Sequence, residues 1–184
     1  MPLDSPTLDL GKLGIAVSGF LAFGPLGTDL PVGFTAEMDP DIRQAGYLSE
    51  EGLKLVFDES RDSIPLWQNR ASLEVTTDAK VMYEGSFAET GKVAVTEFWY
   101  GTTVTQGAEF GSYTIRPGRT SGRGVGVFLE IFSDGNRRLT TSTDCEIFRN
   151  GDAESLATNA TFLPFQVVLY DEPKVYDTRL KTPA

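Results

Sequence analysis

The sequence predicts a mainly β domain, either a β-sandwich or a partial barrel, with one flanking α-helix. Three observations predict it: several segments alternate apolar and polar residues, Asp-Gly or Asn-Gly pairs separate some of them, and one segment changes to a helical spacing. The chain has 184 residues and one cysteine, which suits a single domain over residues 1–184 with a core that needs no disulfide.

The N-terminal part is expected to begin with an extended arm over residues 1–11, which contain two prolines. Residues 13–25 are rich in small, β-branched and aromatic side chains and predict a strand that ends at Pro25. A short helical turn is then expected, with Asp39 as its N-cap and Pro40 in its first position.

A long two-faced hairpin is predicted from two alternating segments, residues 52–58 and 71–87. In the first, Leu53, Leu55 and Phe57 share a face. The residues between the strands, about 58–70, are expected to form a long exposed loop, because they are too many for a tight turn. The polar face of the second strand is expected to carry Glu74, Asp78, Lys80 and Glu84.

The segment after this hairpin predicts a helix, with Thr90 as N-cap and Gly101 as the stop. Phe98, Trp99 and Tyr100 follow one another, so two of them are expected in the core. Strands return over residues 112–117, 124–133, 139–148 and 161–171, with turns at Asp134-Gly135 and Asn150-Gly151, and residues 172–184 predict a C-terminal arm.

Charge and composition exclude several classes of function. The net charge of −10 and the pI of about 4.5 disfavour a DNA-groove binder, because phosphates would repel the protein. The chain contains no histidine, which removes histidine triads and histidine metal sites. Neither a signal peptide nor a long apolar run is present, so we expect a non-membrane protein made in the cytoplasm.

Acidic and glycine-rich motifs do not add up to a catalytic, metal or cofactor site. Asp39, Asp41 and Glu50 have the first, third and twelfth positions of a calcium loop, but Gln44 stands where that loop needs glycine. The adjacent carboxylates at 50–51 and at 58–59 would point to opposite faces of a strand. The Gly/Arg loop at 116–124 precedes a strand rather than a helix, so a flexible loop is expected there and not a phosphate loop. Cys145 is expected to be buried.

The tip of the long hairpin is the most unusual surface feature that the sequence predicts. Ile64, Pro65, Leu66 and Trp67 form an apolar run within an otherwise charged loop. Tryptophan is favoured in the centres of protein interfaces, so this run either contacts a partner or folds back on its own domain.

Three segments resemble the major tail tube proteins of long-tailed, non-contractile bacteriophages, especially those that infect actinobacteria. "AFGPLGTDLP" (22–31) resembles a Gly-Pro-x-Gly-Thr-x-Leu-Pro segment of that family. "AGYLSEEGLKL" (45–55) resembles its Gly-Tyr-(Ile/Val)-Ser-Glu-(Asp/Glu)-Gly motif, which precedes a strand and a loop containing tryptophan. "FLEIFSDGNRRLTTSTDCEI" (128–147) resembles its late hairpin. The segments occur in the family's order and span most of the chain.

The resemblance implies a non-catalytic virion protein of the phage tail. Hexameric rings would stack into a tube, with strands of neighbouring copies joined in an inner β-barrel, and genomic DNA would leave through the lumen without specific binding. The tail tape measure and the tail terminator or tip proteins would be partners. On this basis Ile64 to Trp67 are expected to contact the adjacent ring, and the polar face with Glu74, Asp78, Lys80 and Glu84 to line the lumen.

Two other readings remain open on the sequence. One is a different β-sandwich of a virion, such as a decoration or baseplate protein, in which Trp67 would pack inside its own domain. The other is a carbohydrate-binding β-sandwich, which would need exposed aromatic side chains beside converging carboxylates.

Overall fold

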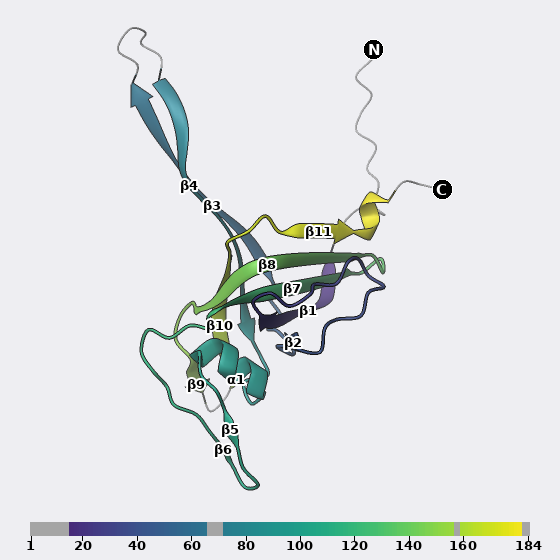
Figure 1. Ribbon diagram of the computed structural model, residues 1–184, viewed down its shortest axis with the longest axis vertical. Helices are drawn as coiled ribbons and strands as arrows, with labels where there is room; N and C mark the ends of the chain where they lie inside the picture. The colour runs from purple at the N-terminus through teal and green to yellow at the C-terminus, as the bar shows by residue number, and fades with distance from the viewer. Residues whose placement is uncertain (1–14, 66–71, 157–158, 182–184) are drawn as a thin grey trace.

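The computed structural model describes residues 15–65, 72–156 and 159–181. They form a curled antiparallel sheet with one helix against it, and two hairpins project from opposite ends of the body (Figure 1). The predicted class, mainly β with one helix, is confirmed. The strand order is β2-β1-β7-β8-β10-β4-β3, with β11 on β8 and β9 on β10, and β5 pairs with β6 separately. The elements are β1 (Ala16–Pro25), β2 (Arg43–Gln44), β3 (Lys54–Pro65), β4 (Ser72–Phe87), α1 (Val93–Tyr100), β5 (Thr105–Gln106), β6 (Gly111–Ser112), β7 (Arg123–Phe132), β8 (Arg137–Arg149), β9 (Glu154–Leu156), β10 (Asn159–Leu169), β11 (Lys174–Asp177) and the 3-10 helix η2 (Thr178–Leu180).

Strand β8 lies in the middle of the sheet, between strands β2, β1 and β7 on one side and strands β10, β4 and β3 on the other. One edge of β8 pairs with β7, while on the other edge its first half pairs with β11 and its second half with β10. Between the two halves of β8, its pairing with β7 shifts register at Gly124 and Gly126. Asp171 holds the β8 backbone at this point, because it accepts hydrogen bonds from Ser142 Oγ (2.6 Å) and from the Thr143 N–H (2.6 Å). Burial raises the pKa of Asp171, but these hydrogen bonds outweigh it and leave the pKa below its usual value.

The main core lies between the sheet and α1. Phe87 stacks on Phe165 with ring centroids 4.1 Å apart, and Tyr83 stacks on Phe128 at 4.3 Å. A second cluster, which includes Ala22, Ile42, Val125, Val127 and Leu139, has Leu30, Phe34 and Met38 packed against it. The alternating strands thus bury apolar side chains against the helix on one side and against residues 30–42 on the other.

Helix α1 ends as predicted but begins later. Its C-cap is Gly101, with φ 59°, a left-handed conformation that glycine adopts without strain. The predicted N-cap, Thr90, is wrong: the N-cap is Lys92, whose N–H closes a turn to the Glu89 carbonyl, so the chain turns for two more residues before the helix starts. Phe98 and Trp99 are buried, as expected for two of the three consecutive aromatic residues.

We expect Gly101→Ala to lower the free energy of unfolding by about 1–3 kcal/mol. A Cβ at this position would meet the Thr120 carbonyl oxygen at 1.9 Å, and the positive φ strains any other residue. Urea denaturation measures the loss. Gly91→Ala is the control, because a Cβ there has no atom within 4 Å among the described residues. Equal effects of the two substitutions would contradict this explanation.

The predicted loop over about 58–70 is too long. Strand β3 continues to Pro65 and β4 begins at Ser72, so the polar residues of this segment pair as a two-stranded ribbon. Pairing of the two strands satisfies their backbone N–H and C=O groups whichever side chains the ribbon carries. Polar side chains are suited to its exposed faces. The turn expected at Asp39 forms: the Ile42 N–H donates to the Asp39 carbonyl (3.0 Å), and the Asp41 N–H donates to Asp39 Oδ1 (2.9 Å). It remains a single turn, and no helix follows it.

Pairing partners determine how much of two further predicted segments is a strand. The C-terminal arm over 172–184 contains β11 and η2, since residues 174–177 pair with the first half of β8. The strand predicted at 112–117 is reduced to β6, because its partner β5 offers only Thr105 and Gln106. The N-terminal arm, residues 1–11, lies outside the described residues.

Candidate functional site

One open edge of the sheet is β3, which carries uncovered apolar side chains. In the described part of the chain, β3 pairs with β4 alone. Leu55 lies opposite Tyr83 and Phe57 opposite Val81, so both are on the sheet face that bears the main core. Tyr83 is 3% exposed, whereas Leu55 is 42% and Phe57 63% exposed. The apolar face therefore extends beyond the domain's own core.

The second open edge is the first half of β1. Strand β2 pairs only with Ala22 and Phe23, and within the described ranges no strand pairs with residues 16–20 on that side. Val17 is 62% exposed. A groove of about 400 Å³ separates residues 16–19 from the segment 47–53 that leads into β3. The unpaired edge of β1 thus borders a groove whose other wall is the segment that leads into β3. Unpaired edges such as those of β1 and β3 favour pairing with another chain.

The face of the β3–β4 hairpin opposite the core is charged. Lys54 pairs with Glu84, Asp58 with Lys80, and Ser60 with Asp78 across the two strands. The Lys80 ammonium lies 2.8 Å from Asp78, and the Lys54 ammonium lies 3.6 Å from Glu84. The hydrogen bond and the charge of Lys80 lower the pKa of Asp78. Asp78, Lys80 and Glu84 share this face, as the alternation predicts.

Glu74 lies beyond an irregularity that the sequence did not reveal. The register shifts between Ser60 and Arg61, so that Asp78 and Thr76 pair with consecutive residues of β3. Such a bulge interrupts the alternation of faces, and the grouping of Glu74 with Asp78 assumed an unbroken strand. Glu74 pairs with Ser63 in the ladder, and its side chain lies outside the description.

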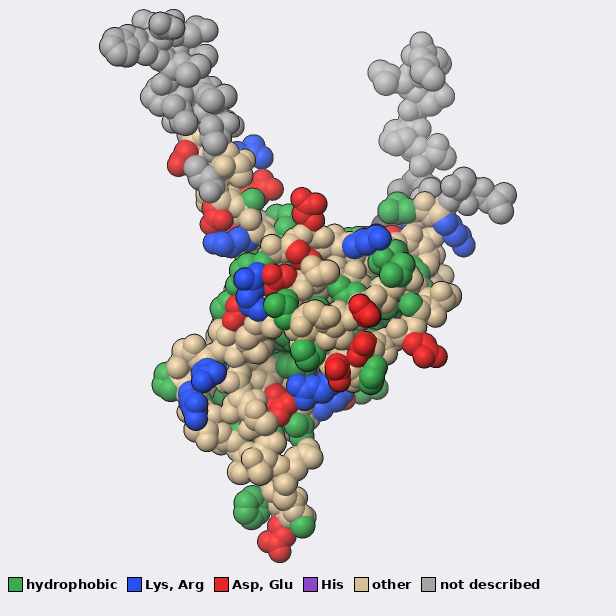
Figure 2. Space-filling view, viewed as in Figure 1, with side chains coloured by type: hydrophobic (Ala, Val, Ile, Leu, Met, Phe, Trp, Pro, Cys, Tyr) green, Lys and Arg blue, Asp and Glu red, His purple; other side chains and the backbone are tan. Residues whose placement is uncertain are grey.

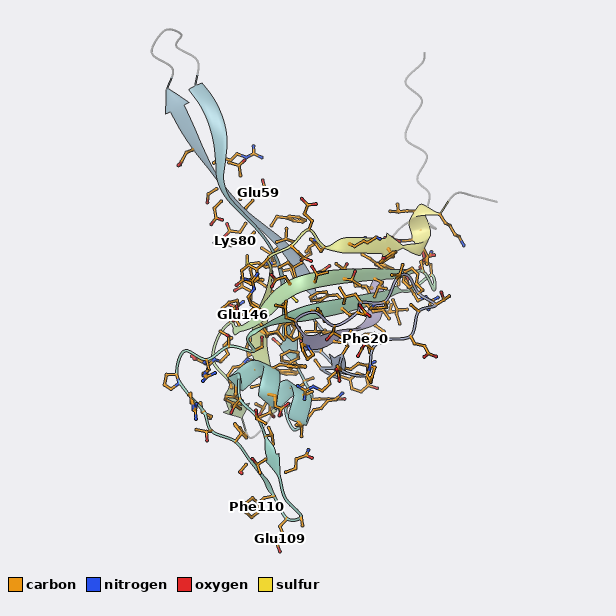
Figure 3. The ribbon with its side chains drawn as sticks, viewed as in Figure 1. Phe20, Glu59, Lys80, Glu109, Phe110 and Glu146 are labelled. Carbon is orange, nitrogen blue, oxygen red and sulfur yellow. The ribbon has the colours of Figure 1, made fainter. Side chains whose placement is uncertain are left out.

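The predicted contact segment falls largely outside the described residues. Ile64 and Pro65 are the last residues of β3, where the ladder but not the side chains is described, and Leu66 and Trp67 lie in the gap. The strands that lead to them leave the body as a narrow ribbon with exposed charged residues, among them Glu59 (Figures 2 and 3).

The comparison with protein families decides which kind of protein has these edges. A model of a phage tail tube protein family matches residues 6–179. The chain belongs to this family. A search of curated proteins gives no match. The molecule is therefore a structural protein of a phage tail, which makes the open edges and the projecting ribbon candidate assembly surfaces.

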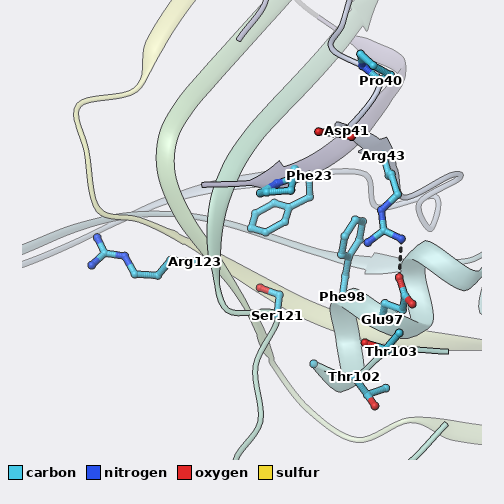
Figure 4. Close-up of a pocket in the computed structure, with 13 residues that line it drawn as sticks. Phe23, Pro40, Asp41, Arg43, Glu97, Phe98, Thr102, Thr103, Ser121 and Arg123 are labelled. Carbon is cyan, nitrogen blue, oxygen red and sulfur yellow. Dashed lines mark hydrogen bonds and ion pairs between the residues drawn. The ribbon is translucent and has the colours of Figure 1, made fainter. Parts of the chain in front are cut away.

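A pocket of about 510 Å³ in this tail tube protein lies between the end of β1, strand β2 and α1 (Figure 4). Two of its charged side chains, Arg43 and Glu97, pair with each other. Arg43 donates to Glu97 at 2.5 Å and lies over the Phe98 ring at 5.2 Å. Burial raises the pKa of Glu97, but the hydrogen bonds from the Val104 N–H and Arg43 outweigh it and lower the pKa overall. Glu97 thus connects both β2 and the segment after α1 to the helix.

Other candidate chemistry of the tail tube protein is limited. Cys145 is buried as expected, and burial raises the pKa of its thiol to about 12. In residues 15–65, 72–156 and 159–181, no three carboxylate or thiol side chains gather in a group that could hold a metal ion. Among the helices described, none has the length and apolar content that a membrane crossing requires.

Sequence reasoning missed two features of the candidate assembly surfaces. The first is that Lys54 and Asp58 face Glu84 and Lys80, because cross-strand register is not visible in the sequence. The second is the exposure of Phe57: its alternation predicts an apolar face, but a pattern does not say whether the domain itself covers that face.

Proposed function

We propose that this tail tube protein closes into hexameric rings by pairing the β3 edge of one copy with the β1 edge of the next. The uncovered core face at Phe57 is the observation that carries the proposal. A cyclic ring needs two different complementary surfaces on each copy, and the two open edges supply them. The number six comes from the resemblance to tube proteins of non-contractile tails.

Rings stacked in one direction would form the tail tube, and the charged hairpin face would line its lumen. Asp78 and Glu84 are the proposed lumen carboxylates of this face, with Lys80 reducing their field. Glu74, which lies beyond the register shift, is proposed to line the next part of the channel. Like charge repels DNA phosphates over about 8 Å at physiological salt, so DNA would pass without being held. No catalytic step is needed. Tape measure, terminator and tip proteins would act as partners while the tail assembles in the host cytoplasm.

Negative-stain electron microscopy of the purified chain at increasing concentration tests the proposal. Hollow tubes of constant diameter are expected. Discrete particles that do not stack at any concentration would instead support a decoration or baseplate protein, and glycan-array binding without assembly would support the carbohydrate-binding alternative.

Replacing Glu74, Asp78 and Glu84 with glutamine should leave tubes intact and slow the release of DNA from assembled virions. Neutral side chains remove the repulsion that keeps the phosphates off the wall. Release after receptor addition can be followed with a DNA-binding dye. The control replaces three exposed carboxylates elsewhere, Asp29, Glu37 and Glu172. An unchanged release rate in the first variant would refute the role of lumen charge.

A further inference from the structure

We infer that the groove between α1 and the β5–β6 hairpin is the receptor for the Ile64–Trp67 segment of a second copy in the adjacent ring. The inference rests on the proposed function and identifies the surface that receives the projecting hairpin. The contact would join two copies head to tail along the tube axis.

The groove is built from the helix and from a hairpin that stands away from it. Its volume is about 500 Å³, and Val93, Val104, Phe110 and Tyr113 provide apolar walls. Phe110 is 74% and Tyr113 43% exposed. A large apolar side chain placed at the tip of a hairpin contributes little to its own domain, so this surface suits a partner.

The position of the groove matches the direction of the projecting ribbon. Strands β3 and β4 leave one end of the body, whereas Glu109 and Phe110 are at the tip of the β5–β6 hairpin at the other end (Figures 1 and 3). Strand β3 runs away from the groove, so the ribbon of one copy does not approach the groove of the same copy. In a head-to-tail repeat, the β3–β4 ribbon of each copy would point toward the groove of the next copy.

The chemistry of the two surfaces is complementary. The segment supplies an aliphatic run and an indole, which needs apolar walls and an acceptor for its N–H. Gln106 and Glu109 line the groove and offer such acceptors. Arg70 follows the segment in the sequence and has the charge opposite to that of Glu109, so an ion pair at the rim would fix the orientation.

Cross-linking in assembled tubes tests the contact directly. Gln68→Cys and Ala108→Cys place thiols beside the segment and in the groove without removing Trp67 or Phe110, and buried Cys145 stays unreactive. A short bis-maleimide is expected to give a ladder of covalent oligomers only from tubes of the double variant. Gln68→Cys with Val32→Cys, a position that is 70% exposed on another part of the surface, is the control. Tubes without the 68–108 ladder, or with an equal ladder in the control, would overturn the inference.

A second measurement compares Phe110→Ala with Ile115→Ala. Phe110 lines the groove, whereas Ile115, 57% exposed on the same segment, does not line it. Phe110→Ala should raise the protein concentration needed for assembly by about tenfold, with an unchanged melting temperature, and Ile115→Ala should not. Equal assembly of both variants would overturn the contact alone. Absence of tubes from the unmodified chain would refute the proposed function itself.

Discussion

Trp67→Ala should leave the monomer folded and abolish tube formation. The side chain belongs to the proposed contact between rings, where an indole buries about 150–250 Å² and commonly contributes at least about 2 kcal/mol. The loss occurs at every subunit of a ring, so the contact between two rings weakens several times over. Circular dichroism checks the fold, and sedimentation with electron microscopy measures assembly.

Trp67→Phe is the matched control for this substitution. It keeps an aromatic ring and removes the indole N–H, so tubes should form at a higher protein concentration than with the unmodified chain. Unimpaired tubes from Trp67→Ala would show that the hairpin tip does not hold the rings together. A lowered melting temperature of the monomer would show that Trp67 packs within its own domain.

Phe57→Lys should prevent ring closure while changing the free energy of unfolding of the monomer by less than about 0.5 kcal/mol. The side chain is already 63% exposed in the monomer, so little burial is lost there. In a ring, the lysine would carry a charge into the apolar face that the neighbouring copy completes, and burying an unpaired charge is costly. Lysine on an edge strand also opposes pairing with another strand.

Analytical ultracentrifugation measures the oligomeric state, and chemical denaturation measures stability. Val32→Lys introduces the same charge at a position that is 70% exposed and belongs to neither β1 nor β3. It should assemble normally. Rings from Phe57→Lys would rule out the β3 edge as an interface, and equal loss in both variants would assign the effect to added charge rather than to position.

Local sequence signals predicted the elements whose boundaries depend on local chemistry. Alternation located β4, Gly101 marked the end of α1, and the turn at Asp134-Gly135 joins β7 to β8. The polar ends of β3 and β11 were missed, because their pairing depends on partners rather than on a pattern of burial. A strand that forms by completing a ladder leaves little trace in its own side chains.

The sequence predicted which charged residues share the hairpin face, but not the register of the two strands or their position at the edge of the sheet. Alternation grouped Asp78, Lys80 and Glu84 on one face. It could not reveal the register shift before Glu74, since a bulge depends on the pairing of two strands. It also could not show that the face containing Phe57 lies at an edge without cover, because strand order is a property of the whole fold.

The β3–β4 ribbon beyond the body has consequences for how a tube would begin. Two strands with no third strand or helix against them are marginally stable in water, so in the proposed tube the ribbon would be stabilised by a surface of another copy. An isolated subunit would lack that surface, whereas a finished ring would present it several times at once. We therefore expect growth at existing tube ends to outpace the formation of new ones, so that an initiating complex would determine where each tail starts.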